Sequence, residues 1–293
     1  MNKFSVSYAQ ELDKKDPLKS FRNRFELNDP NLIYLDGNSL GALPKQTPER
    51  LNQLVHEEWG NRLIRSWNEG WYERSQDIAV KIAQLIGAQK DEVIVADSTS
   101  INLFKLAYGA LKIQKDKTEI VSDELNFPSD VYLLQGLIDL FRNKHLLKLA
   151  KSDDGLSVND AELEKQITEN TALVTLSHVT FKSAFMYDMK SVTELARKKG
   201  SLILWDLSHS VGAVPIDLNA CNVDLAIGCT YKYLNGGPGS LAFLYVKKEL
   251  QEIKENEKLT MELNVFPYRK TKKKRRGKDK LILKATAAQM NQV

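Results

Sequence analysis

Lys232 is the residue of this sequence whose neighbours most favour covalent chemistry. It lies in a polar connection between two apolar runs, 225–228 and 241–246, which have the length and branching of buried strands. A lysine at the end of a buried strand loses hydration, which lowers its pKa and leaves a nucleophilic amine. Such an amine can form a Schiff base with an aldehyde cofactor. The competing interpretation, a solvated loop lysine, is the commoner one for a lysine considered alone.

Asp206 ends the apolar run 202–206 within the segment WDLSHS. A carboxylate in that position is costly to bury without a cation. A protonated pyridine nitrogen is a natural partner, and the pair would turn the ring into an electron sink. His209 would then lie close to the cofactor and orient either Asp206 or a phosphate. A helix cap is the competing interpretation of Asp206.

Hydroxyl and aromatic residues follow other apolar runs. Thr99 and Ser100 open a predicted helix, where free backbone N–H groups favour an anion, although ordinary capping explains them too. In the segment FPSD, Phe127 could stack on a flat pyridine ring. Ser177 is placed to reach a cofactor ring, whereas His178 is either part of the site or a packed side chain.

The elements that must position these residues alternate along the chain. Apolar runs separated by helical segments indicate a mainly parallel sheet covered on both faces, and ligands bind beyond the carboxyl ends of such strands. The predicted strands are 93–96, 119–122, 146–149, 172–177, 202–206, 225–228 and 241–246. The predicted helices are 47–60, 76–86, 100–111, 129–142, 158–167 and 189–199, after a helical arm over 1–30 and a short strand at 33–35.

The motifs LDGNSLG, FPSD, WDLSHS and CTYKYLNGGPGS resemble those of kynureninases, which use pyridoxal 5′-phosphate (PLP) on the aspartate-aminotransferase fold. The resemblance implies the α/β large domain of PLP fold type I, with a seven-stranded mainly parallel sheet. It implies that Lys232 holds PLP and removes an α-proton, that Asp206 keeps the ring nitrogen protonated, and that Tyr231 binds phosphate and relays protons. The other cofactor-binding residues that it implies are Thr99, Ser100, Phe127, Pro128, Ser129, Asp130, Ser177 and His209, with Asn38 and Ser39 at the mouth of the site.

The implied reaction is hydrolysis of L-kynurenine, or its 3-hydroxy form, to an anthranilate and L-alanine in tryptophan catabolism and NAD biosynthesis. A cytoplasmic homodimer without metal, membrane or nucleic-acid partners is expected. Trp67, Trp71 and Tyr72 either pack together or line the pocket for an aromatic substrate. The alternatives on the same fold are a small-substrate aminotransferase and a cysteine desulfurase, but Phe127 replaces the usual stacking histidine and no cysteine follows Cys229.

Charge is distributed unevenly along the 293 residues. Residues 265–284 carry a net charge of +9, and since the whole chain carries +4, the rest carries −5. An acidic body argues against a nucleic-acid surface there, whereas the basic tail makes a non-enzymatic nucleic-acid-associated protein the alternative from another class. No apolar run reaches the roughly 18 residues of a membrane span, and the start lacks the apolar core of a signal peptide. Cys221 and Cys229 are expected to be free thiols.

The resemblance predicts three regions. They are an arm with the mouth loop over 1–45, a PLP-binding domain over 46–250, and a basic, disordered tail over 251–293. Kynureninases continue beyond this point into a C-terminal domain that supplies an arginine for the substrate carboxylate, and the tail resembles no part of it. A truncated or frame-shifted product with little activity, or an inactive PLP-binding remnant, is therefore expected.

Overall fold

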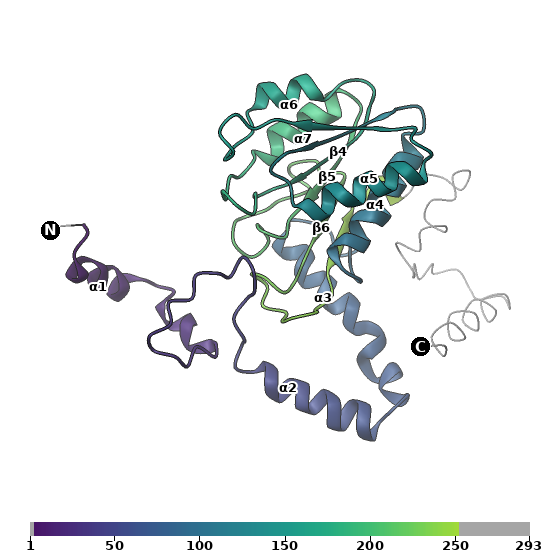
Figure 1. Cartoon of the computed structure of the whole chain (residues 1–293). Helices are drawn as coiled ribbons and strands as arrows, with labels where there is room; N and C mark the ends of the chain where they lie inside the picture. The colour runs from purple at the N-terminus through teal and green to yellow at the C-terminus, as the bar shows by residue number, and fades with distance from the viewer. Residues whose placement is uncertain (1–2, 252–293) are drawn as a thin grey trace. The chain divides into compact units, whose positions relative to one another are not determined.

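A seven-stranded sheet forms the centre of the computed structural model, which describes residues 3–251 (Figure 1). Its strand order is β1-β7-β6-β5-β4-β2-β3; β7 is antiparallel to both neighbours, and the other neighbours pair in parallel. The predicted fold class is confirmed. The strands are β1 (Val93–Val95), β2 (Glu119–Asp123), β3 (Leu146–Ala150), β4 (Thr171–Ser177), β5 (Leu202–Asp206), β6 (Leu225–Gly228) and β7 (Phe243–Val246).

Helices lie on both faces of the sheet, as parallel strands require. Helices α4 and α5 pack against each other on one face, and α6 and α7 lie on the other (Figure 1). The α-helices are α1 (Val6–Lys15), α2 (Thr47–Gln53), α3 (Tyr72–Leu85), α4 (Thr99–Ile113), α5 (Pro128–Leu140), α6 (Asp160–Gln166), α7 (Met189–Lys198) and α8 (Lys248–Gln251). A 3₁₀ segment (Lys19–Arg24) and two π-helical segments (Leu54–Asn61 and Trp67–Trp71) complete the set.

Strand β5 shows how side chains divide between the two faces. Ile203 and Trp205 join the hydrophobic core shared with α7, and Trp205 Nε1 donates a hydrogen bond to Thr193 Oγ1 (3.1 Å). Because successive side chains of a strand alternate, Asp206 points to the opposite face, which α4 and α5 cover. The carboxylate that ends β5 is therefore on the α4–α5 face.

Two predicted elements near the N-terminus differ from the structure. The helix predicted over 47–60 begins at Thr47 without a side-chain cap, and it widens into the π-helix Leu54–Asn61. An apolar period near 3.6 does not distinguish these two helix types. The strand predicted at 33–35 is wrong, because this segment pairs with no strand. Its residues Ile33 and Leu35 are 82% and 86% exposed.

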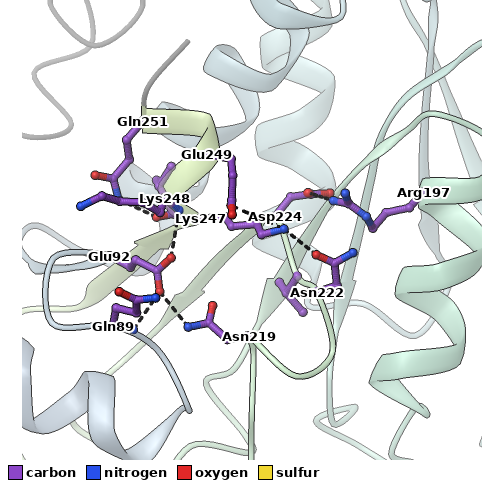
Figure 2. Close-up of polar contacts among 12 residues, drawn as sticks. Gln89, Glu92, Arg197, Asn219, Asn222, Asp224, Lys247, Lys248, Glu249 and Gln251 are labelled. Carbon is purple, nitrogen blue, oxygen red and sulfur yellow. Dashed lines mark hydrogen bonds and ion pairs between the residues drawn. The ribbon is translucent and has the colours of Figure 1, made fainter.

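A cluster of polar side chains fixes the end of β7 (Figure 2). Glu92 is buried and accepts hydrogen bonds from the backbone N–H of Lys248 (2.9 Å) and from Asn219 Nδ2 (3.1 Å). Asp224 is also buried and forms an ion pair with Arg197. Burial raises the pKa of Asp224, and the Arg197 charge opposes that rise. Side chains from separate segments thus set the direction in which the chain leaves the sheet.

Several broader expectations can be compared with the described residues. No helix among them is both long and apolar enough to cross a bilayer. Cys221 is partly buried, Cys229 is buried, and both are free thiols. Within residues 3–251, no group of three or more His, Cys, Asp or Glu side chains is arranged to hold a metal ion. The predicted basic tail lies almost wholly outside the described residues.

Candidate active site

Lys232 lies in the loop that follows β6, at the edge of the sheet where β4 and β5 also end. Its side chain is only 7% exposed, and its Nζ lies 2.5 Å from His209 Nε2. Burial lowers the pKa of Lys232, while electrostatic interactions with Cys229, Asp206 and Asp130 oppose that change. The net lowering favours the neutral amine, which is the form that attacks a carbonyl carbon.

His209 is the direct neighbour of this amine. Burial, together with the nearby Lys232 charge, lowers the pKa of His209 to about 4, so its ring is neutral at pH 7. Its Nδ1 atom is buried and has no hydrogen-bond partner among the described residues. A buried polar atom without a partner is costly, so a bound polar group at this position would stabilise the ring.

Two buried carboxylates lie near Lys232. Asp206 accepts a hydrogen bond from the backbone N–H of Ser208 (2.8 Å), and burial raises its pKa. Burial and the Asp206 charge raise the pKa of Asp130 to about 7, although the Ser129 hydroxyl, which donates to it (3.2 Å), and Lys232 oppose the rise. A pair of this kind favours a ligand that brings a positive charge.

Aromatic rings border the amine. The ring centroids of Phe127 and Tyr231 each lie 5.8 Å from Lys232 Nζ, and the Phe127 ring also meets Phe181 edge to face with centroids 5.1 Å apart. Phe127 is 39% exposed, so its ring is not used up by core packing. Pro128 begins α5 directly after it and fixes the backbone at the start of the helix.

The loop that carries Lys232 (the lysine loop) turns tightly at three residues. Asn235, Gly237 and Gly239 all have positive φ angles, of 55°, 85° and 74°. Thr230 closes the loop, because its hydroxyl lies 2.7 Å from Ser240 Oγ and its carbonyl accepts the backbone N–H of Gly236 at 2.8 Å. Tight closure at both ends holds Lys232 at one position relative to the sheet.

The mouth loop LDGNSLG contacts the lysine loop directly. The backbone N–H of Gly41 donates to the carbonyl of Tyr231 (2.9 Å). A Cβ atom at Gly41 would lie only 2.1 Å from the carbonyl oxygen of Lys232, so only glycine fits there. Asn38 and Ser39 lie in the turn just before this contact, and their proposed role at the site mouth stays a prediction.

Thr99 and Ser100 occupy the first turn of α4, but Ser98 is the residue that caps the helix, accepting the N–H of Ile101 at 3.4 Å. Two backbone hydrogen bonds join the loop before α4 to Ala242, which follows the lysine loop: Ala96 N–H donates to the Ala242 carbonyl (2.9 Å), and Ala242 N–H donates to the Asp97 carbonyl (2.8 Å). The anion site predicted at Thr99 and Ser100 is thereby tied to the chain that carries Lys232, and its role stays a prediction.

Other candidates lie elsewhere. His178 packs its ring edge to face on Trp205, with centroids 5.8 Å apart, so it belongs to the α7 side of the sheet. Trp67 and Tyr72 pack on each other (5.7 Å), and Trp71 Nε1 donates to Glu58 (2.6 Å). These contacts agree with the packing interpretation of the aromatic segment.

Asn126 is a buried residue near the site that the sequence motifs do not single out. Its side-chain oxygen accepts hydrogen bonds from the Ser177 hydroxyl (2.8 Å) and from the backbone N–H of Phe127 (2.8 Å). The residue directly precedes FPSD and could have drawn attention as a polar residue in the short loop after a buried strand. Its partner Ser177, however, lies on β4, far from Asn126 in sequence.

Comparison with known proteins agrees with the geometry. The family model for class-V aminotransferases matches residues 33–264. Kynureninases of Pseudomonas fluorescens and of Burkholderia mallei (strain SAVP1) are each 46% identical over 83% of this chain and 58% of their own length. This chain therefore spans about 58% of the length of these relatives. This identity over most of the chain confirms the resemblance to kynureninases.

Solved structures show the same fold. The apo cysteine desulfurase of Thermococcus onnurineus NA1 superimposes with a TM-score of 0.64 at 22% identity, over 82% of this chain and 57% of that one. A C-DES mutant with glycine covalently linked to its PLP cofactor gives 0.66 at 18% identity, over 78% and 60%. The sheet, the buried lysine beyond β6 and the family match lead to one conclusion: the chain belongs to the class-V aminotransferase family.

Proposed function

We propose that this chain binds PLP through Lys232 and carries the cofactor site of a kynureninase-like hydrolase. The observation that carries the proposal is the buried Lys232 amine, whose pKa is lowered by burial, beside two buried carboxylates and two aromatic rings. The 46% identity to kynureninases supports the choice of reaction. A solvated lysine would have none of these neighbours.

The residues present fit PLP. The carboxylates of Asp206 and Asp130 suit a protonated pyridine nitrogen, because a cation there would offset the cost of burying them. Phe127 offers a partly exposed ring for stacking. The unpartnered Nδ1 of His209 is available to a polar group of the cofactor. The first turn of α4 offers Thr99, Ser100 and free N–H groups for a phosphate.

When bound, PLP supplies an electron sink for breaking bonds at the α- and β-carbons of an amino acid. Lys232 would hold the cofactor, and its free amine would accept the α-proton of the substrate. Asp206 would stabilise positive charge on the ring nitrogen. Tyr231, beside Lys232, would donate a proton to the β-carbon, which becomes the methyl group of L-alanine. His209 stays neutral at pH 7 and orients the polar groups near the amine.

The substrate proposed is L-kynurenine or its 3-hydroxy form, a small molecule whose Cβ–Cγ bond is broken by addition of water to the γ-carbonyl. The products are then an anthranilate and L-alanine, as expected for tryptophan catabolism and NAD biosynthesis. We place the protein in the cytoplasm as a homodimer. The named relatives support the activity, while the location and the assembly stay predictions.

Borohydride trapping tests the site. The chain is incubated with PLP, reduced with borohydride, digested, and mapped for pyridoxyllysine. We expect the label on Lys232 and its loss in Lys232→Ala, whereas Lys247→Ala, which replaces a lysine at the opposite end of the sheet, should label normally. Label on another lysine, or none, contradicts the proposal.

The reaction is tested separately by anthranilate fluorescence with L-kynurenine and added PLP. Release of anthranilate that depends on Lys232 supports the hydrolase. PLP bound at Lys232 together with transamination or release of sulfide from other amino acids, and no anthranilate, would assign the site to a different reaction.

A further inference from the structure

Asn126 lies between β2 and α5, directly before the ring residue Phe127. Its side chain is 4% exposed. A buried side-chain amide needs partners for two N–H donors and for the lone pairs of its oxygen. The identities of those partners decide what the residue does in the fold.

All of its hydrogen-bonding capacity is used. Asn126 Oδ1 accepts from the Phe127 backbone N–H (2.8 Å) and from Ser177 Oγ (2.8 Å). Asn126 Nδ2 donates to Ser122 Oγ (2.9 Å) and is 3.5 Å from the Thr175 carbonyl oxygen. Because a backbone N–H can only donate, the oxygen of the amide must face Phe127, and this fixes the orientation of the side chain.

The amide joins parts of the site that are distant in sequence. Ser122 belongs to β2, while Thr175 and Ser177 belong to β4. Ser177 pairs in register with Asp206 on the next strand, and the two residues share the face covered by α4 and α5. One buried side chain therefore connects the ring residue Phe127 with the Ser177 hydroxyl, which lies beside the site carboxylate of Asp206.

The hydrogen bond to Asn126 also determines whether the Ser177 hydroxyl can donate to a ligand or only accept from it. Ser177 has one O–H proton, and it is donated to Asn126 Oδ1. What Ser177 presents to a ligand is consequently a pair of acceptor lone pairs and no proton. A serine in an apolar surrounding could rotate its hydroxyl and donate instead.

We propose that Asn126 is a positioning residue for the cofactor site, which holds the Phe127 ring in place and commits the Ser177 hydroxyl to accepting hydrogen bonds. This inference rests on the proposed PLP site. Asn126 has no direct contact with Lys232 among the described contacts, so it acts through Phe127 and Ser177.

PLP affinity of the full chain, measured by absorbance titration, tests the proposal in Asn126→Ala. We expect affinity to fall about tenfold, the order of one lost buried hydrogen-bond partner, with borohydride label still on Lys232. The matched control is Asn219→Ala at the opposite end of the sheet (Figure 2). Asn219 also has buried partners, since it donates to Glu92 (3.1 Å) and accepts from the Tyr245 hydroxyl (3.0 Å).

Asn219→Ala should lower the melting temperature, as Asn126→Ala does, but change PLP affinity less than about twofold. Ser122→Ala is a milder variant, because it removes only the hydrogen bond from Asn126 Nδ2 to Ser122. It serves as the test if Asn126→Ala does not fold. We expect it to lower the affinity for PLP about threefold. In Asn126→Ala with Ser177→Ala, the two losses of affinity should be less than additive, because the residues share one hydrogen bond.

Unchanged PLP affinity in Asn126→Ala and Ser122→Ala, or equal losses in these variants and in Asn219→Ala, would overturn the positioning role and leave the PLP site standing. Fully additive losses in the double variant would overturn the action through Ser177. Absence of PLP binding by the unchanged chain would instead overturn the proposed function, and the positioning role with it.

Discussion

Among single residues, Asp130 is expected to make the stability of the fold depend on pH. Its pKa of about 7, raised by burial and by the Asp206 charge, lies well above its ordinary value of 3.8. The folded state therefore holds this proton more tightly than the unfolded state does. The resulting stabilisation is complete below about pH 4 and is lost as the pH rises through about 7.

Asp130→Asn removes this dependence. We expect the melting temperature of the PLP-free chain to fall less between about pH 5 and pH 8 in the variant than in the unchanged protein. Thermal melts at a series of pH values measure the difference. Asp139→Asn, at an exposed position on the same helix, is the control and should keep the original profile. If the melting temperatures of Asp130→Asn and of the unchanged chain depend on pH in the same way, the pKa of Asp130 is not raised by folding.

At the scale of elements, the two loops around Lys232 depend on each other. The mouth loop reaches the lysine loop at Gly41, where no side chain can be accommodated, whereas Gly37 in the same loop faces the Tyr233 ring at ordinary contact distance. A Cβ atom would lie 2.1 Å from the nearest atom at Gly41 and 3.6 Å from it at Gly37. The chain thus provides a matched pair of glycines.

Gly41→Ala is expected to destabilise the chain by about 1–3 kcal/mol, because the added methyl group pushes the loop away from the Lys232 carbonyl. Gly37→Ala should change stability by less than about 0.5 kcal/mol. Urea unfolding measures both values, and PLP release rates show whether the loop shift reaches the site. Equal effects of the two substitutions would mean that the loops do not touch in solution.

The strands were predictable from sequence and the contacts across them were not. The strands are short runs rich in apolar residues, bounded by polar or turn-forming residues. For this reason the bounds predicted for two of them, 202–206 and 225–228, are those of the structure. The order of the strands is a tertiary property, because β2 pairs with β4 only after the chain has passed through β3. The role of Asn126 depends on that pairing, and no local pattern indicates it.

For the site, too, the sequence indicates which residues are unusual but not which of them face the ligand. Lys232, Asp206 and Phe127 were recognised because each has an unusual residue type for its position at the end of an apolar run. His178 has the same kind of position, but its side chain points to the opposite face, where Trp205 packs on it. Periodicity places residues on alternate faces, yet it does not say which face holds the ligand.

At the scale of the whole molecule, apolar side chains near the N-terminus bear on assembly. Ile33 and Leu35 are 82% and 86% exposed, where the chain enters the mouth loop. Large apolar side chains gathered on a surface are typical of association sites. The expected homodimer would cover them and would place this segment, and through it the Gly41 contact, at a subunit interface.

The substitutions Ile33→Ser and Leu35→Ser together should therefore weaken self-association. We expect light scattering coupled to gel filtration to give about twice 33.3 kDa for the unchanged chain and a shift toward 33.3 kDa for the double variant. The control is Leu140→Ser with Leu156→Ser, since those leucines are 64% and 59% exposed at other places in the fold and should leave the mass unchanged. A monomeric unchanged chain, or equal shifts in both double variants, would remove the segment from the interface and confine the mouth loop's role to its own subunit.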